Sequence, residues 1–114
     1  MSFNISSGTM VSKAVKLTTT GATTLITASG RTIVLSVIAA EINGSTPTLT
    51  LELNDGTTSY YIRKGKAMVA NATEIINETF VLPSGWTLKA TAGTANQIDV
   101  VATWMSSDAQ NRGG

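Results

Sequence analysis

The segment covering residues 31–42 constrains the fold of this chain more than any other. Its apolar side chains would occupy both faces of a strand: Ile33, Leu35, Val37 and Ala39 on one face, and Val34, Ile38 and Ala40 on the other. Such near-continuous apolarity is typical of a central strand that is covered on both faces, within its own domain or by a partner. A helix over residues 34–42 is the alternative. Because the run is short, β-branched and bounded by Gly30 and Asn43-Gly44, we predict a strand.

Alternation of apolar and polar residues recurs along the rest of the chain, whereas helical spacing does not. Residues 48–53 alternate most cleanly, and the Asp55-Gly56 pair that follows is typical of a tight hairpin turn. We predict the returning strand at residues 59–63 and a further turn at Lys64-Gly65-Lys66. Other strands are predicted at residues 10–17, 23–27, 73–82, 86–91 and 98–104, and the pattern leaves residues 67–70 without an assignment.

These segments predict an all-β fold, an antiparallel β-sandwich or small barrel of seven to eight strands spaced about 8–12 residues apart. The length of 114 residues corresponds to one domain, and the 19 threonines suit a half-exposed pleated surface. We expect the domain to cover residues 10–105, with a polar arm at residues 1–9 and a polar tail at residues 106–114. The predicted core contains Ile33, Leu35, Val37, Leu49, Leu51, Leu53, Leu88, Val100 and Trp104.

The side-chain chemistry of the chain is narrow. It has no histidine and no cysteine, which excludes catalytic triads, thiol chemistry, disulfides and zinc bound by those residues. No glycine-rich phosphate-binding pattern occurs, and the carboxylates form no calcium-binding pattern. We expect Glu74 and Glu78 to be solvated charges on a strand face. The sequence therefore predicts no enzymatic activity, no cofactor and no metal site.

The charge and hydropathy patterns limit the partners of the chain. A formal net charge of +1 implies neither a nucleic acid nor an anionic membrane as partner. The first eight residues lack a basic stretch followed by an apolar run, so they do not resemble a secretory signal. The apolar run from residue 33 to residue 42 is interrupted by Ser36 and Glu41 and is too short for a membrane span. We expect a soluble chain.

One basic cluster lies beside two tyrosines, and we name Tyr61, Arg63, Lys64 and Lys66 as possible partner contacts. Basic residues beside aromatic rings suit a charged partner protein, a single strand of nucleic acid or a sugar, although a solvated hairpin tip is the plainer interpretation. Alternation would place Tyr60 and Tyr61 on opposite faces, one in the core and one exposed. Trp86 and Trp104 fall on the apolar side of their strands, which predicts core positions; stacking platforms for carbohydrate are the alternative.

The order of several segments resembles a known family. These segments are Gly30-Arg31-Thr32-Ile33-Val34-Leu35-Ser36-Val37, Thr48-Leu49-Thr50-Leu51-Glu52-Leu53 with Asp55-Gly56, Tyr60-Tyr61-Ile62, the turn Pro83-Ser84-Gly85 with Trp86-Thr87-Leu88-Lys89-Ala90, and Ile98-Asp99-Val100-Val101-Ala102-Thr103-Trp104. Together they resemble the small β-sandwich virion proteins of tailed bacteriophages. The resemblance spans about residues 23–105, and residues 71–78 depart from it.

The resemblance implies a non-enzymatic structural protein located in the virion and present in many copies. A capsid decoration or cement protein is the first interpretation, and a neck, tail or baseplate accessory protein is the second. The implied partners are the major coat protein or tail and neck subunits, together with further copies of this chain. The family offers no catalytic residue to carry over.

A stand-alone carbohydrate-binding or adhesin-like module is the alternative from another class, with Tyr61, Trp86 or Trp104 as its platforms. In a virion protein, by contrast, we expect residues 2–8 and 106–114 to be mobile in the free chain and ordered in the assembled particle. Their small polar side chains offer too little apolar surface to offset the entropy of ordering.

Overall fold

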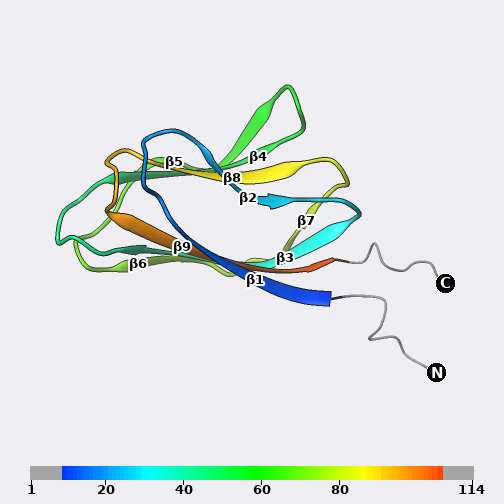
Figure 1. Ribbon diagram of the computed structural model, residues 1–114, viewed down its shortest axis with the longest axis horizontal. Coiled ribbons are helices and arrows are strands. Elements are labelled where there is room, and N and C mark those ends of the chain that lie inside the picture. Colours follow the sequence, from blue (N-terminus) through cyan, green and yellow to red (C-terminus); the bar gives the residue numbers. More distant parts are fainter. Residues whose placement is uncertain (1–8, 107–114) are drawn as a thin grey trace.

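The computed structural model describes residues 9–106, which form nine strands in two antiparallel sheets (Figure 1). The strands are β1 Thr9–Lys16, β2 Thr23–Thr27, β3 Thr32–Glu41, β4 Thr48–Asn54, β5 Ser59–Ala67, β6 Thr73–Ile76, β7 Phe80–Leu82, β8 Thr87–Ala92 and β9 Ile98–Ser106. The predicted all-β sandwich is confirmed. The strand count exceeds the predicted seven to eight because the segment predicted as one strand at residues 73–82 is divided into β6 and β7.

The two sheets form the two layers of the sandwich (Figure 1). The five-stranded sheet has the order β1-β9-β3-β6, with β7 also paired to β3, and the four-stranded sheet has the order β2-β8-β4-β5. β3 is therefore central, since β9 pairs with one of its sides and β6 and β7 share the other. This position agrees with the near-continuous apolarity of its sequence.

A β-bulge in β3 changes which of its residues face the core. Val34 pairs with Trp104 of β9 and Ser36 pairs with Thr103, so Leu35 is an extra residue without a partner. The extra residue shifts the alternation by one position. Val34 and Val37 are both fully buried, whereas Ile33 and Leu35 are partly exposed. The prediction of Ile33 and Leu35 as core residues was therefore wrong.

The core lies between the two sheets and is built of leucine, isoleucine, valine and alanine side chains. Val37, Leu49, Leu51, Leu88 and Val100 are fully buried, as predicted. Leu53 and Trp104 are only partly buried but pack against this cluster.

The arms predicted at the two ends lie almost entirely outside the described residues. β1 begins at Thr9 and β9 ends at Ser106, so Ser106 belongs to a strand and not to the tail. The mobility expected of residues 2–8 and 107–114 stays a prediction. Within residues 9–106, no helix is long and apolar enough to cross a membrane.

A buried carboxylate holds the loops together at one end of the sandwich. Glu41, the last residue of β3, is 3% exposed. Its Oε1 accepts hydrogen bonds from the backbone N–H of Gly44 (2.9 Å) and of Asn71 (2.8 Å), and its Oε2 accepts one from that of Asn43 (2.9 Å). Ser45 Oγ donates to Glu41 Oε2 at 3.2 Å and also bonds Gln97 Oε1. The Glu41 side chain thus links the β3–β4 and β5–β6 loops, and Ser45 extends the link to the β8–β9 loop.

Burial alone would raise the pKa of Glu41, but the hydrogen bonds from Asn71, Asn43 and Ser45 outweigh it and lower the pKa from 4.5 to about 2. Hydrogen bonds from Thr58 and Thr57 likewise lower the pKa of Asp55 in the β4–β5 turn. Both carboxylates are therefore more acidic in the folded chain than in the unfolded chain.

We expect the fold to lose stability in acid. As the pH falls from about 4.5 towards 2, the unfolded chain takes up a proton on Glu41 that the folded chain does not, which favours unfolding. Urea denaturation at a series of pH values should show a falling midpoint over this window. Glu41→Gln should lower stability at pH 7 and flatten the pH dependence, whereas the control Glu78→Gln, at an exposed position, should keep the wild-type slope. An unchanged slope in Glu41→Gln would contradict the assignment.

Leu51→Ala should destabilise the protein by about 2–5 kcal/mol, because the substitution leaves a cavity among fully buried side chains. The free energy of unfolding from urea titration measures this loss. Val69→Ala is the control, since this apolar residue is 70% exposed and should change stability little. A loss below about 0.5 kcal/mol for Leu51→Ala would mean that β4 has a different register.

Candidate partner-contact site on β5

β5 continues through the turn predicted at Lys64-Gly65-Lys66, and that prediction was wrong. Lys66 pairs with Leu49 of β4 and Arg63 pairs with Leu51, so Lys64 and Gly65 together face the single residue Thr50. Gly65 has a positive φ of 60°, and its N–H donates to Thr50 Oγ1 at 3.0 Å. The glycine therefore forms a β-bulge inside the strand, because only glycine adopts this backbone geometry without strain.

A second bulge lies three residues before Gly65, directly after the two tyrosines. Arg63 pairs with Leu51 and Tyr61 pairs with Glu52, which leaves Ile62 as the extra residue. Tyr60 and Tyr61 are each 48% exposed, so the prediction that one of them is a core residue was wrong. Tyr60 lies opposite Leu53 and stacks on Trp86, with ring centroids 5.7 Å apart.

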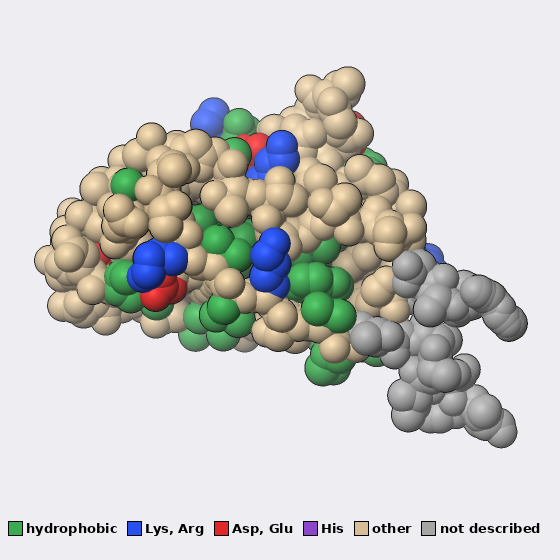
Figure 2. Space-filling view, in the orientation of Figure 1, with side chains coloured by type: hydrophobic (Ala, Val, Ile, Leu, Met, Phe, Trp, Pro, Cys, Tyr) green, Lys and Arg blue, Asp and Glu red, His purple; other side chains and the backbone are tan. Residues whose placement is uncertain are grey.

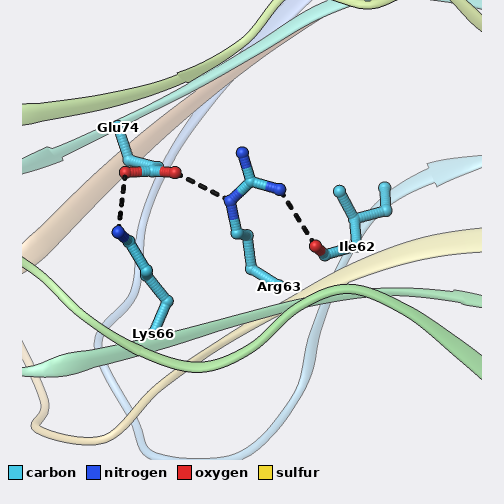
Figure 3. Close-up of polar contacts among 4 residues, drawn as sticks. All are labelled: Ile62, Arg63, Lys66 and Glu74. Carbon is cyan, nitrogen blue, oxygen red and sulfur yellow. Dashed lines mark hydrogen bonds and ion pairs between the residues drawn. The ribbon is translucent and has the colours of Figure 1, made fainter.

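Arg63 and Lys66 are directed across the edge of the sandwich towards the other sheet. Their β4 partners, Leu51 and Leu49, point into the core, and residues paired directly across strands share a face. Figure 3 shows both basic side chains meeting Glu74 of β6. Arg63 Nε lies 2.7 Å from Glu74 Oε2 and Lys66 Nζ lies 3.9 Å from Oε1. These ion pairs join β5 of one sheet to β6 of the other.

The Arg63 guanidinium is held from a second side as well. Its Nη1 donates to the backbone carbonyl of Ile62 at 3.0 Å (Figure 3). Arg63 and Lys66, two of the four predicted partner contacts, are thus engaged within the chain. Only their remaining hydrogen-bond donors are available to another molecule.

Tyr61 and Lys64 form the outward part of the predicted site. Tyr61 pairs with Glu52, whose neighbour Leu51 points inward, so Tyr61 lies on the outer face of the four-stranded sheet. Lys64 Nζ lies 4.8 Å from the centroid of the Tyr61 ring, within cation–π distance. The structure therefore brings Tyr61 and Lys64 together at the surface and separates them from the Arg63–Glu74–Lys66 cluster.

The aromatic rings considered as carbohydrate platforms already have partners. Trp86 stacks on Tyr60 and packs against the core, and Trp104 also packs against the core. The Lys64 ammonium group lies over the ring of Tyr61.

Within the described part of the chain, no group of three or more carboxylates could hold a metal ion. A depression between Lys66 and Glu74 has a volume of about 40 Å³, which is room for a few water molecules.

Sequence analysis did not identify Glu74 or Glu41 as structural groups. Glu74 was expected to be a solvated charge, but it faces the inner side of β6 opposite the buried Ala39. The two apolar residues that follow it, Ile75 and Ile76, were the available sign of a structural position. Its basic partners, Lys66 and Arg63, lie 8 and 11 residues earlier, and the sequence analysis did not connect them with Glu74. Glu41 offered the same kind of signal, since it ends an apolar strand.

Comparisons with known proteins give a likeness of fold. No protein family and no curated protein matches this sequence. Among solved structures, a pentameric capsid protein isolated from metagenomic phage sequences is similar, with a TM-score of 0.53 and 17% identity over 92% of this chain. A second structure with the same description has a TM-score of 0.48 and 19% identity, also over 92% of this chain. The chain spans 64% and 65% of the two proteins. The likeness to the first of these structures establishes a shared fold.

Replacing Glu74 should weaken the link between the two sheets. We expect Glu74→Gln to lower the free energy of unfolding by about 0.5–1.5 kcal/mol, because both ion pairs lose their charge while the shape of the side chain is kept. Urea denaturation of this variant beside Glu78→Gln measures the difference. Glu78 lies in the exposed segment between β6 and β7, so its substitution should have little effect. Equal effects of the two substitutions would contradict a role for the ion pairs.

Proposed function

We propose that this chain is a non-enzymatic structural protein of a tailed-phage virion, and that it decorates and stabilises the capsid through protein–protein contacts. The observation that carries the proposal is the fold shared with a phage capsid protein over 92% of this chain. The resemblance of the strand and turn sequences to small virion sandwiches supports the same conclusion from the residues.

The side chains agree with a role in contact rather than in chemistry. The sequence lacks histidine and cysteine, and two of the carboxylates, Glu41 and Glu74, are engaged in holding loops and sheets together. What the described surface offers to another molecule is the Tyr61–Lys64 pair and a set of exposed apolar side chains. Exposed tyrosine and apolar residues are typical of protein interfaces.

Tyr61 and Lys64 are our candidates for direct contact with a coat or tail subunit. The pair projects from a bulged edge strand and presents an aromatic ring and an ammonium group together. Such a combination suits a partner surface with a carboxylate beside an apolar patch. Arg63 and Lys66 support the pair by fixing β5 against β6.

A neck, tail or baseplate position differs from capsid decoration in the number of copies per particle. Mass spectrometry of purified virions, with peptides quantified against the major coat protein, distinguishes the two. We expect this chain at a copy number comparable to that of the coat protein. A number far below it would favour the neck, tail or baseplate, and absence from intact virions would overturn the proposal.

The contact site is tested by the same measurement on virions assembled with Lys64→Glu. Reversal of this exposed charge should lower incorporation, because it repels an acidic partner surface. Thr20→Glu, in the exposed segment between β1 and β2, is the charge-changing control and should be incorporated normally. Normal incorporation of Lys64→Glu would remove Tyr61 and Lys64 as contacts while leaving the proposed virion role in place.

A further inference from the structure

The two outer faces of the sandwich differ in chemistry. On the four-stranded sheet, two successive rows of residues across the strands face outward, and all of these residues are polar apart from one tyrosine. The first row is Thr24, Lys89, Glu52 and Tyr61, and the second row is Thr27, Thr87, Asn54 and Ser59. This is the composition expected of a sheet face in contact with water. The five-stranded sheet does not follow this pattern on its outer face.

Two apolar rows cross the outer face of the five-stranded sheet. The register places Met10 beside Met105, Met105 beside Ile33, and Ile33 beside Val81, which forms the first row. It places Ala14 beside Val101, Val101 beside Ile38, and Ile38 beside Ile75, which forms the second row. We call these eight residues the outer apolar face. Met10, Ile75 and Val81 are 64%, 55% and 49% exposed.

Four of the polar side chains on this face are paired two by two. Between the two rows lie Ser12 and Thr103, whose hydroxyl groups are 3.3 Å apart. Beyond the second row, Lys16 Nζ lies 2.8 Å from Asp99 Oδ1, so the two charges compensate. Figure 2 shows hydrophobic side chains along the lower margin of the molecule, the side that the five-stranded sheet occupies in Figure 1.

We infer that the outer apolar face is covered by a second copy of this chain. The inference rests on the face alone and does not depend on the proposed virion role. Together with Lys16 and Asp99, this face reaches across four paired strands and over seven positions along β1 and β9, a patch of roughly 15 by 20 Å. Because a specific interface buries at least about 600 Å² on each copy, the contact is centred on this patch and includes the rim around it.

Charge favours a copy of the same chain as the occupant. The face is neutral because Lys16 and Asp99 compensate, and the full chain carries a formal charge of only +1, so two copies hardly repel one another. The face offers no unpaired charge that would select a partner of opposite sign. A shallow depression of about 310 Å³, lined in part by Ala14, Lys16, Asp99 and Val101, can receive a side chain of the second copy.

Sedimentation of the purified full chain over a wide concentration range tests the inference. We expect wild-type protein to form a dimer or a closed ring. The double variant Ile38→Thr/Val101→Thr should shift towards monomer, with a dissociation constant raised about tenfold or more, because polar atoms enter the centre of the contact while β-propensity is kept. Ile75→Thr, on the short edge strand β6, is a milder variant in case the double variant does not fold.

Lys89→Thr, on the outer face of the four-stranded sheet, is the matched control and should associate like the wild type. Circular dichroism checks that each variant is folded. The inference is overturned if the wild-type chain stays monomeric at every concentration. It is also overturned if the Ile75→Thr variant and the double variant are folded and associate as strongly as the wild type. Because this measurement uses the chain alone, its outcome is separate from incorporation into virions.

Discussion

β3 lies at the centre of the five-stranded sheet with apolar side chains on both faces, and most of the fold depends on how those faces lose contact with water. On the inner side, Val34, Val37 and Ala39 are fully buried against the leucines of β4 and β8. Along its edges, β9 pairs with one side and β6 and β7 with the other. At its end, Glu41 fixes the neighbouring loops. On the outer side, Ile33 and Ile38 remain partly exposed in the single chain.

The fold class and most strand positions could be predicted because alternating side chains are a property of each strand by itself. The errors occurred at Leu35, Ile62 and Gly65, where β-bulges lie. A bulge adds one residue to one strand of a pair, so its place depends on the partner strand, which lies far away in the sequence. A regular alternation counted across a bulge then assigns the residues on one side of it to the wrong face, as it did for Ile33.

The candidate site was predictable in composition but not in its contacts. The cluster of Tyr61, Arg63, Lys64 and Lys66 is visible in the sequence, yet its division into an inward pair and an outward pair results from the two bulges. Glu74 and Glu41 resembled ordinary surface charges because their partners come from other strands and loops. Sequence shows which groups are available, and tertiary register decides which groups meet.

The edge strands of both sheets are unsuited to accept a further strand. β6 and β7 have four and three residues, β2 has five with an irregular register, and β5 contains two bulges. β1 is longer and regular, but its Lys13 lies on the inner side opposite the buried Ala102 and reaches the Thr24 carbonyl at 3.5 Å. Inward charges, short strands and bulges are the devices that prevent sheets from joining edge to edge. Crowded copies of this chain should therefore resist growth into fibrils, even at high protein concentration.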